Sequence, residues 1–114
     1  MATKTFILNN YRASAGYKNS ATSGGVQIQI QGYITCYGDG HRFILYFLHK
    51  DSPVANPVFN ASTKVGTIFL PFEDMPIYLD ILRNEKPVYA YLNSTKPEWN
   101  SIRTSNEPVG EEEN

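Results

Sequence analysis

The sequence predicts an α+β protein in which a curved antiparallel sheet of four or more strands is followed by one helix packed on its apolar face. Three observations lead to this fold class. Residues 26–37 alternate apolar and polar side chains, Asp39-Gly40 separates two apolar runs, and residues 73–86 contain an apolar stripe with helical spacing. Alternation with a period of two indicates a strand, whereas apolar residues at i, i+3, i+4 and i+7 indicate a helix.

Residues 26–50 are predicted to form a β-hairpin around which the rest of the chain is organised. An Asp-Gly pair between apolar runs favours a two-residue type I′ turn, because both central residues of that turn need a positive φ. One face then collects the apolar and small residues of the first strand, which are Val26, Ile28, Ile30, Gly32, Ile34 and Cys36. The other face pairs Tyr37 with Arg42, Tyr33 with Tyr46, Gln31 with Leu48 and Gln29 with Lys50.

A further strand is expected before this hairpin in the sequence, and another after it. Residues 3–11 contain the apolar run Phe6-Ile7-Leu8 and predict a first strand. Residues 12–25 are rich in Ser, Ala, Gly and Asn, so we expect a connecting loop there. Residues 51–64 are a second expected loop. Residues 65–72 predict a strand that ends at Pro71 or lies at an edge of the sheet, because proline cannot donate a hydrogen bond to a neighbouring strand.

The helix predicted within residues 73–86 is apolar over more than half of its circumference. Pro76 fits the first turn of a helix, and Pro87 disfavours helical geometry at the residue before it. One sheet covers only one side of such a helix, and a second copy of the chain is the economical cover for the other side. The sequence therefore predicts a homodimer, with the candidate interface residues Ile77, Tyr78, Ile81 and Leu82.

The C-terminal part predicts two more strands and an acidic end. Residues 88–92 alternate around Tyr89 and Tyr91, and residues 99–104 predict a return strand. We expect a single domain over residues 1–106, where ten Lys and Arg against seven Asp and Glu give a charge of +3. Residues 107–114 form a tail with four Glu and a charge of −4. A solvated terminus and a tail that competes with nucleic acid for the domain both fit this asymmetry.

Composition bounds the class of protein. The chain has 114 residues, which favours one domain, and no apolar run approaches the roughly 20 residues that span a membrane. The first residues lack the basic-then-apolar layout of a signal peptide. The single cysteine, Cys36, excludes an internal disulfide and falls on the predicted core face. We therefore expect a cytoplasmic protein with no membrane partner.

No pattern in the sequence predicts catalysis. His41 and His49 lie on one predicted strand about 26 Å apart, which is too far for them to share a metal ion. Phosphate-binding loops, nucleophile elbows and dinucleotide-binding fingerprints do not occur. We therefore expect a non-catalytic protein that uses no cofactor and holds no metal.

Aromatic and basic residues gather on the polar face of the predicted hairpin. These candidate binding residues are Tyr33, Tyr37, Arg42, Tyr46 and Lys50. Bases of single-stranded nucleic acid stack on tyrosine rings, while Arg and Lys contact the phosphates, so the sequence predicts a surface for single-stranded DNA or RNA. The same residue types are enriched in protein interfaces, and an interaction or assembly module without a nucleic-acid role is the alternative.

The order of strands, apolar helix and further strand resembles the single-stranded-DNA-binding transcriptional regulator fold of positive cofactor four and the Whirly proteins. Four stretches carry a closer resemblance, and they are Leu70-Pro71-Phe72, residues 78–83, residues 86–92 and residues 107–111. In these stretches the chain is similar to small uncharacterised cyanobacterial proteins of that architecture. The resemblance implies a homodimer packed through its helices and favours DNA binding, but it assigns no individual site residue. The chain departs from those proteins in lacking their conspicuous basic surface.

Overall fold

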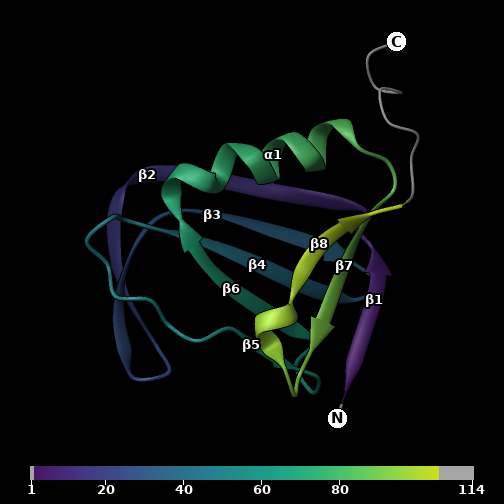
Figure 1. Cartoon of the computed structure of the whole chain (residues 1–114), viewed down its shortest axis with the longest axis horizontal. Coiled ribbons are helices and arrows are strands. Elements are labelled where there is room, and N and C mark those ends of the chain that lie inside the picture. The colour runs from purple at the N-terminus through teal and green to yellow at the C-terminus, as the bar shows by residue number, and fades with distance from the viewer. Residues whose placement is uncertain (1, 106–114) are drawn as a thin grey trace.

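The computed structural model describes residues 2–105 and confirms the α+β class (Figure 1). It contains two sheets, so the prediction of one curved antiparallel sheet is wrong. The small sheet has the strand order β1-β7-β8, and the large sheet has the order β2-β3-β4-β6-β5. The strands are β1 (Thr3–Ile7), β2 (Asn10–Ser23), β3 (Val26–Gly38), β4 (His41–Leu48), β5 (Val58–Asn60), β6 (Val65–Pro71), β7 (Val88–Asn93) and β8 (Ser101–Thr104).

The β3–β4 hairpin forms with the predicted two-residue turn. Asp39 and Gly40 have φ values of 50° and 71°, the left-handed conformation that a type I′ turn requires. The turn sets the predicted register, which pairs Gly38 with His41, Cys36 with Phe43, Ile34 with Leu45, Tyr37 with Arg42 and Tyr33 with Tyr46. The middle of the large sheet therefore has one face of buried apolar residues and one face that carries the tyrosines.

The predicted register fails at the far end of this hairpin. An irregularity between Ile30 and Gly32 pairs Ile30 with Leu48, where the alternation predicted Gln31, and the amide of His49 donates to the carbonyl of Gln29. A bulge of one residue moves every side chain beyond it to the opposite face. The predicted Gln31–Leu48 and Gln29–Lys50 pairs are therefore wrong.

The bulge also changes the neighbours of the apolar residues that precede it. Ile28 packs in a small separate cluster with Leu48 and Ala55, and the cluster is flanked by Ala21, Val26, Ile30, Tyr46 and Phe69. Leu48, Tyr46 and Phe69 share the face opposite Ile34. The prediction that Val26, Ile28 and Ile30 share a face with Ile34 is thus wrong.

Residues 12–25, predicted as a loop, belong mostly to strand β2. This strand pairs antiparallel with β3 from Asn10–Tyr37 to Ser23–Val26, with a register shift between Ala15 and Asn19. Its side chains are nearly all exposed or half-buried, so the strand needs no apolar alternation. The strand pairs with β3 through its backbone, and its Ser- and Ala-rich composition contains no alternation that would predict a strand.

The region after β4 contains the one parallel strand pair between the described residues. β6 lies beside β4 in parallel, with Tyr46 opposite Phe69, which corrects the expectation of a wholly antiparallel sheet. The connection between them, predicted as a loop to residue 64, includes the short edge strand β5, which pairs antiparallel with β6. The predicted strand over residues 65–72 is confirmed as β6.

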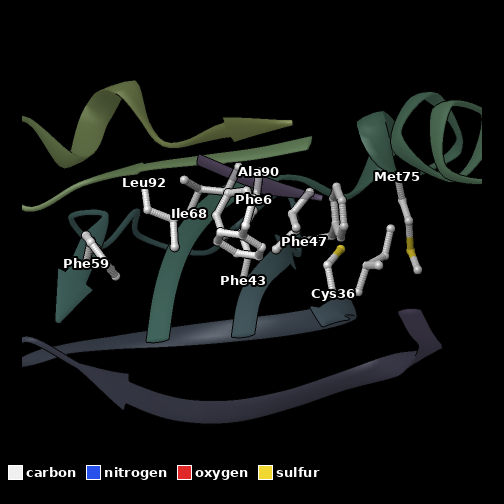
Figure 2. Close-up of a cluster of buried hydrophobic side chains, with 11 residues drawn as sticks. Phe6, Cys36, Phe43, Phe47, Phe59, Ile68, Met75, Ala90 and Leu92 are labelled. Atoms are coloured by element: carbon white, nitrogen blue, oxygen red, sulfur yellow. The ribbon is translucent and has the colours of Figure 1, made fainter. Parts of the chain in front are cut away.

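The main core lies between the large sheet on one side and the small sheet together with the helix on the other (Figure 2). We call the face of the large sheet toward this core the inner face, and the opposite face the outer face. The core joins Phe6 of β1, Ala90 and Leu92 of β7 and Met75 of the helix to residues of the large sheet, which include Ile34, Cys36, Phe43, Leu45, Phe47 and Ile68. Each fully buried Leu or Phe stabilises the fold by about 1.5–3 kcal/mol.

The predicted helix is present as a 3₁₀ turn, η1 (Phe72–Asp74), followed by α1 (Met75–Asn84). Met75 is buried, and Tyr78, Leu79 and Leu82 pack against the core, as the stripe predicts. Gly32 lets the helix come close, because a Cβ atom there would lie 2.9 Å from Met75 Sδ. In the described part of the chain, none of the helical segments has the length and apolarity to cross a membrane.

The C-terminal hairpin completes the small sheet. The predicted strand over residues 88–92 is confirmed as β7, and β8 covers most of the predicted return strand. A short 3₁₀ turn, η2 (Pro97–Trp99), connects them. Asn100 stabilises this connection, because its side-chain oxygen accepts from the Asn93 amide at 2.8 Å. The predicted acidic tail, residues 107–114, lies outside the described residues.

Candidate nucleic-acid interface

Three aromatic side chains form a row across the outer face of the large sheet. Tyr33 of β3 lies directly opposite Tyr46 of β4, and Tyr46 lies opposite Phe69 of β6. The rings of Tyr46 and Phe69 are stacked, with centroids 5.5 Å apart and an interplanar angle of 13°. All three side chains are half-buried, so each ring is held by its neighbours and keeps part of its surface exposed. We call Tyr33, Tyr46 and Phe69 the aromatic row.

Two arginines flank this row toward the Asp39-Gly40 turn. Arg42 lies opposite Tyr37, and Arg12 of β2 lies opposite Thr35, so both belong to the outer face. Tyr37 is half-buried, whereas both arginine side chains keep contact with solvent. Pairing places the following residues on this part of the outer face: Asn10, Arg12, Ser14, Tyr33, Thr35, Tyr37, Arg42, Ile44, Tyr46, Val58, Asn60, Val65, Thr67 and Phe69. Arg12 and Arg42 are the charged residues in this described set, and both are cations.

Lys50 does not lie among the tyrosines. It follows the end of β4, in the turn that continues from His49, and it is exposed. The bulge near Gln31 removes the expected pairing of Lys50 with Gln29. Lys50 instead lines a cavity at the end of β4 and β6 together with Gln31 and Phe69. Of the five candidate binding residues, the structure thus brings four together and sets Lys50 beyond the row.

The four candidate dimer residues lie on different sides of α1. Tyr78 and Leu82 pack against the core of their own chain, and the Tyr78 ring lies 5.8 Å from that of Phe47. Ile77 is 58% exposed, and Ile81 is half-buried. Burial, together with the nearby charge of Asp74, raises the pKa of Tyr78 above its ordinary value. A homodimer through this helix stays a prediction, for which Ile77 offers the most accessible apolar surface of the four.

Among the described titratable groups, burial perturbs the Cys36 thiol and an exposed ion pair joins Lys4 to Asp39. Burial raises the pKa of Cys36 to about 12, which keeps it in the unreactive thiol form. Lys4 Nζ lies 2.6 Å from the carboxylate of Asp39 and lowers the pKa of that carboxyl. Within residues 2–105, no group of three or more His, Cys, Asp and Glu is placed to hold a metal ion.

Two residues of this surface, Arg12 and Phe69, were not among the candidates predicted from the sequence. Arg12 stood in a segment expected to be a loop, and only its pairing with Thr35 places it on the sheet. Phe69 had a usable signal, because Val65, Thr67 and Phe69 alternate with Gly66 and Ile68 along one strand. That alternation predicts that Phe69 lies on the outer face of β6, but it does not predict that Phe69 lies beside Tyr46.

Comparison of the chain with protein families, with curated proteins and with solved structures found no match. The resemblance to positive cofactor four and the Whirly proteins therefore stays a prediction, and the case for a function rests on the geometry of the outer face.

Proposed function

We propose that this protein binds single-stranded nucleic acid across the outer face of the large sheet. The observation that carries the proposal is the aromatic row, which crosses three adjacent strands beside Arg12 and Arg42. Aromatic platforms accept any base, because every base has a π-face, and neighbouring cations contact the phosphates. The surface suits a ligand whose sequence is not read in detail.

Tyr37 provides a second platform on the same face. Tyr33 and Tyr37 are four residues apart on β3, which places their Cα atoms about 13 Å apart along the strand. Arg42 lies directly opposite Tyr37, and Arg12 lies opposite Thr35, between the two tyrosines. A single-stranded nucleic acid that stacks one base on the aromatic row and another on Tyr37 would bring its phosphate backbone past both arginines.

The proposal is tested by titrating a fluorescently labelled single-stranded oligonucleotide with the full chain and measuring anisotropy. We expect saturable binding at about 50 mM salt that weakens at about 200 mM, because contacts to phosphates release condensed counterions. A duplex of the same sequence is the control, since its stacked bases cannot reach the rings, and it should bind more weakly. Absence of binding at the lower salt concentration would reject the proposal.

A second candidate function, a self-associating interaction module, is favoured by the exposed side chain of Ile77. This residue lies one turn from Ile81 on the solvent side of α1, and an exposed Ile beside a half-buried Ile can form the centre of a helix–helix contact. Light scattering of the wild-type chain and of Ile77→Glu tests it. We expect a dimer that the substitution converts to a monomer, with Asn84→Glu on the same helix as the control. A wild-type monomer at high concentration would reject this function.

A further inference from the structure

A cavity of about 520 Å³ opens beside the aromatic row, where β4 and β6 end. Its walls include Leu48 from the end of β4, Phe69 from β6 and Phe72 from η1. This volume lies within the range of about 300–1,000 Å³ that is usual for small-molecule sites. Because Phe69 belongs both to the cavity wall and to the aromatic row, the cavity continues the surface described above.

The polar groups of the cavity offer both donors and acceptors. Gln31, Lys50 and Glu73 line it, and they supply an amide, an ammonium and a carboxylate. Gln31 is half-buried and Glu73 is exposed, so both side chains are accessible to a ligand. Few convergent polar groups over apolar and aromatic walls are the usual composition of a site for a ring-bearing ligand.

The position of Gln31 results from the β-bulge. In a regular strand its side chain would share a face with Leu48, but the register shift pairs Leu48 with Ile30 and leaves Gln31 between two paired residues. Bulges often re-aim a side chain next to a functional site. The bulge thus has two local effects: it places Ile28 and Ile30 on the face that carries Leu48, and it leaves the Gln31 amide at the cavity.

We propose that this cavity takes up one nucleobase, with the phosphate attached to its sugar contacting Lys50. The walls formed by Phe69 and Phe72 provide aromatic surface for the base, and Gln31 and Glu73 provide hydrogen bonds for its edge. Lys50 is exposed at the end of β4 and carries the charge that a phosphate requires. If the base belongs to a single-stranded nucleic acid, this inference rests on the proposed function. A free mononucleotide offers the same chemistry, and the experiment separates these two sources.

The experiment is a titration of the ¹⁵N-labelled full chain, followed by NMR, with adenosine 5′-monophosphate and separately with a single-stranded oligonucleotide. We expect saturable shifts of the amides of Gln31, Lys50 and Phe72 with both ligands. Ribose 5-phosphate is the control ligand, because it keeps the phosphate and lacks the base. It should bind the cavity at least about tenfold more weakly, given the contribution of base stacking to affinity.

Two variants test the assigned contacts. Lys50→Ala should weaken mononucleotide binding about tenfold, as expected for the loss of a charged hydrogen bond, whereas Lys86→Ala removes the same charge from an exposed site outside the cavity and should have no effect. Phe72→Leu keeps an apolar side chain and removes the ring, and it should weaken binding by about fivefold or more. Equal effects of Lys50→Ala and Lys86→Ala would overturn the assignment of Lys50 as the phosphate contact.

The outcomes separate this inference from the proposed function. If the oligonucleotide shifts the amides of Tyr33 and Tyr46 but leaves the cavity unchanged, base uptake is wrong and binding to the outer face stands. If the mononucleotide shifts the cavity but the oligonucleotide does not bind, the cavity is a mononucleotide site and the proposed function is wrong. If neither ligand shifts the cavity amides, the inference is overturned.

Discussion

Arg42→Ala and Tyr33→Ala should weaken nucleic-acid binding in two distinguishable ways. Arg12 and Arg42 on the outer face and Lys50 at its end make three phosphate contacts possible. For single strands the slope of log K against log salt is about −0.7 per contact, so the wild-type slope should be about −2. Affinity should then fall about twentyfold between about 50 and about 200 mM salt.

Each variant changes a different part of this behaviour. Arg42→Ala removes one contact and should reduce the slope by about 0.7. Tyr33→Ala removes one stacking platform and should weaken binding about 5- to 150-fold at every salt concentration, with the slope unchanged. The fold should survive this change, because a cross-strand pair such as Tyr33–Tyr46 contributes only about 0.2–1 kcal/mol.

Fluorescence anisotropy at four salt concentrations measures the affinity and the slope together. Arg83→Ala is the matched control, since Arg83 is exposed near the end of α1 and α1 packs on the inner side of the large sheet. It should leave the affinity and the slope close to the wild-type values. Equal effects of Arg83→Ala and Arg42→Ala would refute binding through the outer face, because binding would then depend on the total charge of the protein.

Three further predictions concern the fold. Gly38→Ala should destabilise the protein by about 3 kcal/mol or more in urea unfolding, because its Cβ would overlap the backbone carbonyl of Ile7, which cannot move aside as a side chain can. Cys36 should resist alkylation in the native protein and react only when urea unfolds the chain, as its burial and its pKa of about 12 require; rapid native labelling would contradict this placement. Lys4 lowers the pKa of Asp39, so this carboxylate stabilises the fold above its unfolded-state pKa, and the contribution is lost as pH falls through the folded-state pKa. Asp39→Asn should therefore lower the melting temperature at pH 7 and have no effect in strong acid, which thermal unfolding at both pH values checks.

The hairpin was predictable because its signals are local. A positive φ at Asp39 and Gly40 is a property of those two residues, and it determines the pairing from Gly38–His41 to Tyr33–Tyr46. The helix was predictable for the same reason, since its stripe and its prolines lie within one short segment. Local sequence also placed Tyr33, Tyr37, Arg42 and Tyr46 on one face.

The bulge and the second sheet were not predictable from such local signals. Alternation runs through Gln31 without a break, so the sequence alone does not show where the faces exchange. One local signal was present but not used. Residues 43–48 are apolar at every position, which indicates that this strand is covered on both faces near Leu48. The pairing of β1 with β7 joins residues 82 to 90 positions apart, and no local pattern specifies that contact.

The distribution of charge explains why the small net charge does not argue against nucleic-acid binding. Four of the seven Asp and Glu in residues 2–105 lie between residues 73 and 85, on or next to α1, whereas the described outer-face positions carry only Arg12 and Arg42. Of these four acids, Asp74, Asp80 and Glu85 lie on or next to α1, which packs on the inner side of the large sheet, whereas Glu73 lines the cavity beside Phe69. Charges separated by more than the Debye length, about 8 Å at physiological ionic strength, are largely screened from one another. A nucleic-acid strand on the outer face would therefore meet Arg12 and Arg42 along the sheet, and would meet Lys50 and Glu73 only where it reaches the cavity.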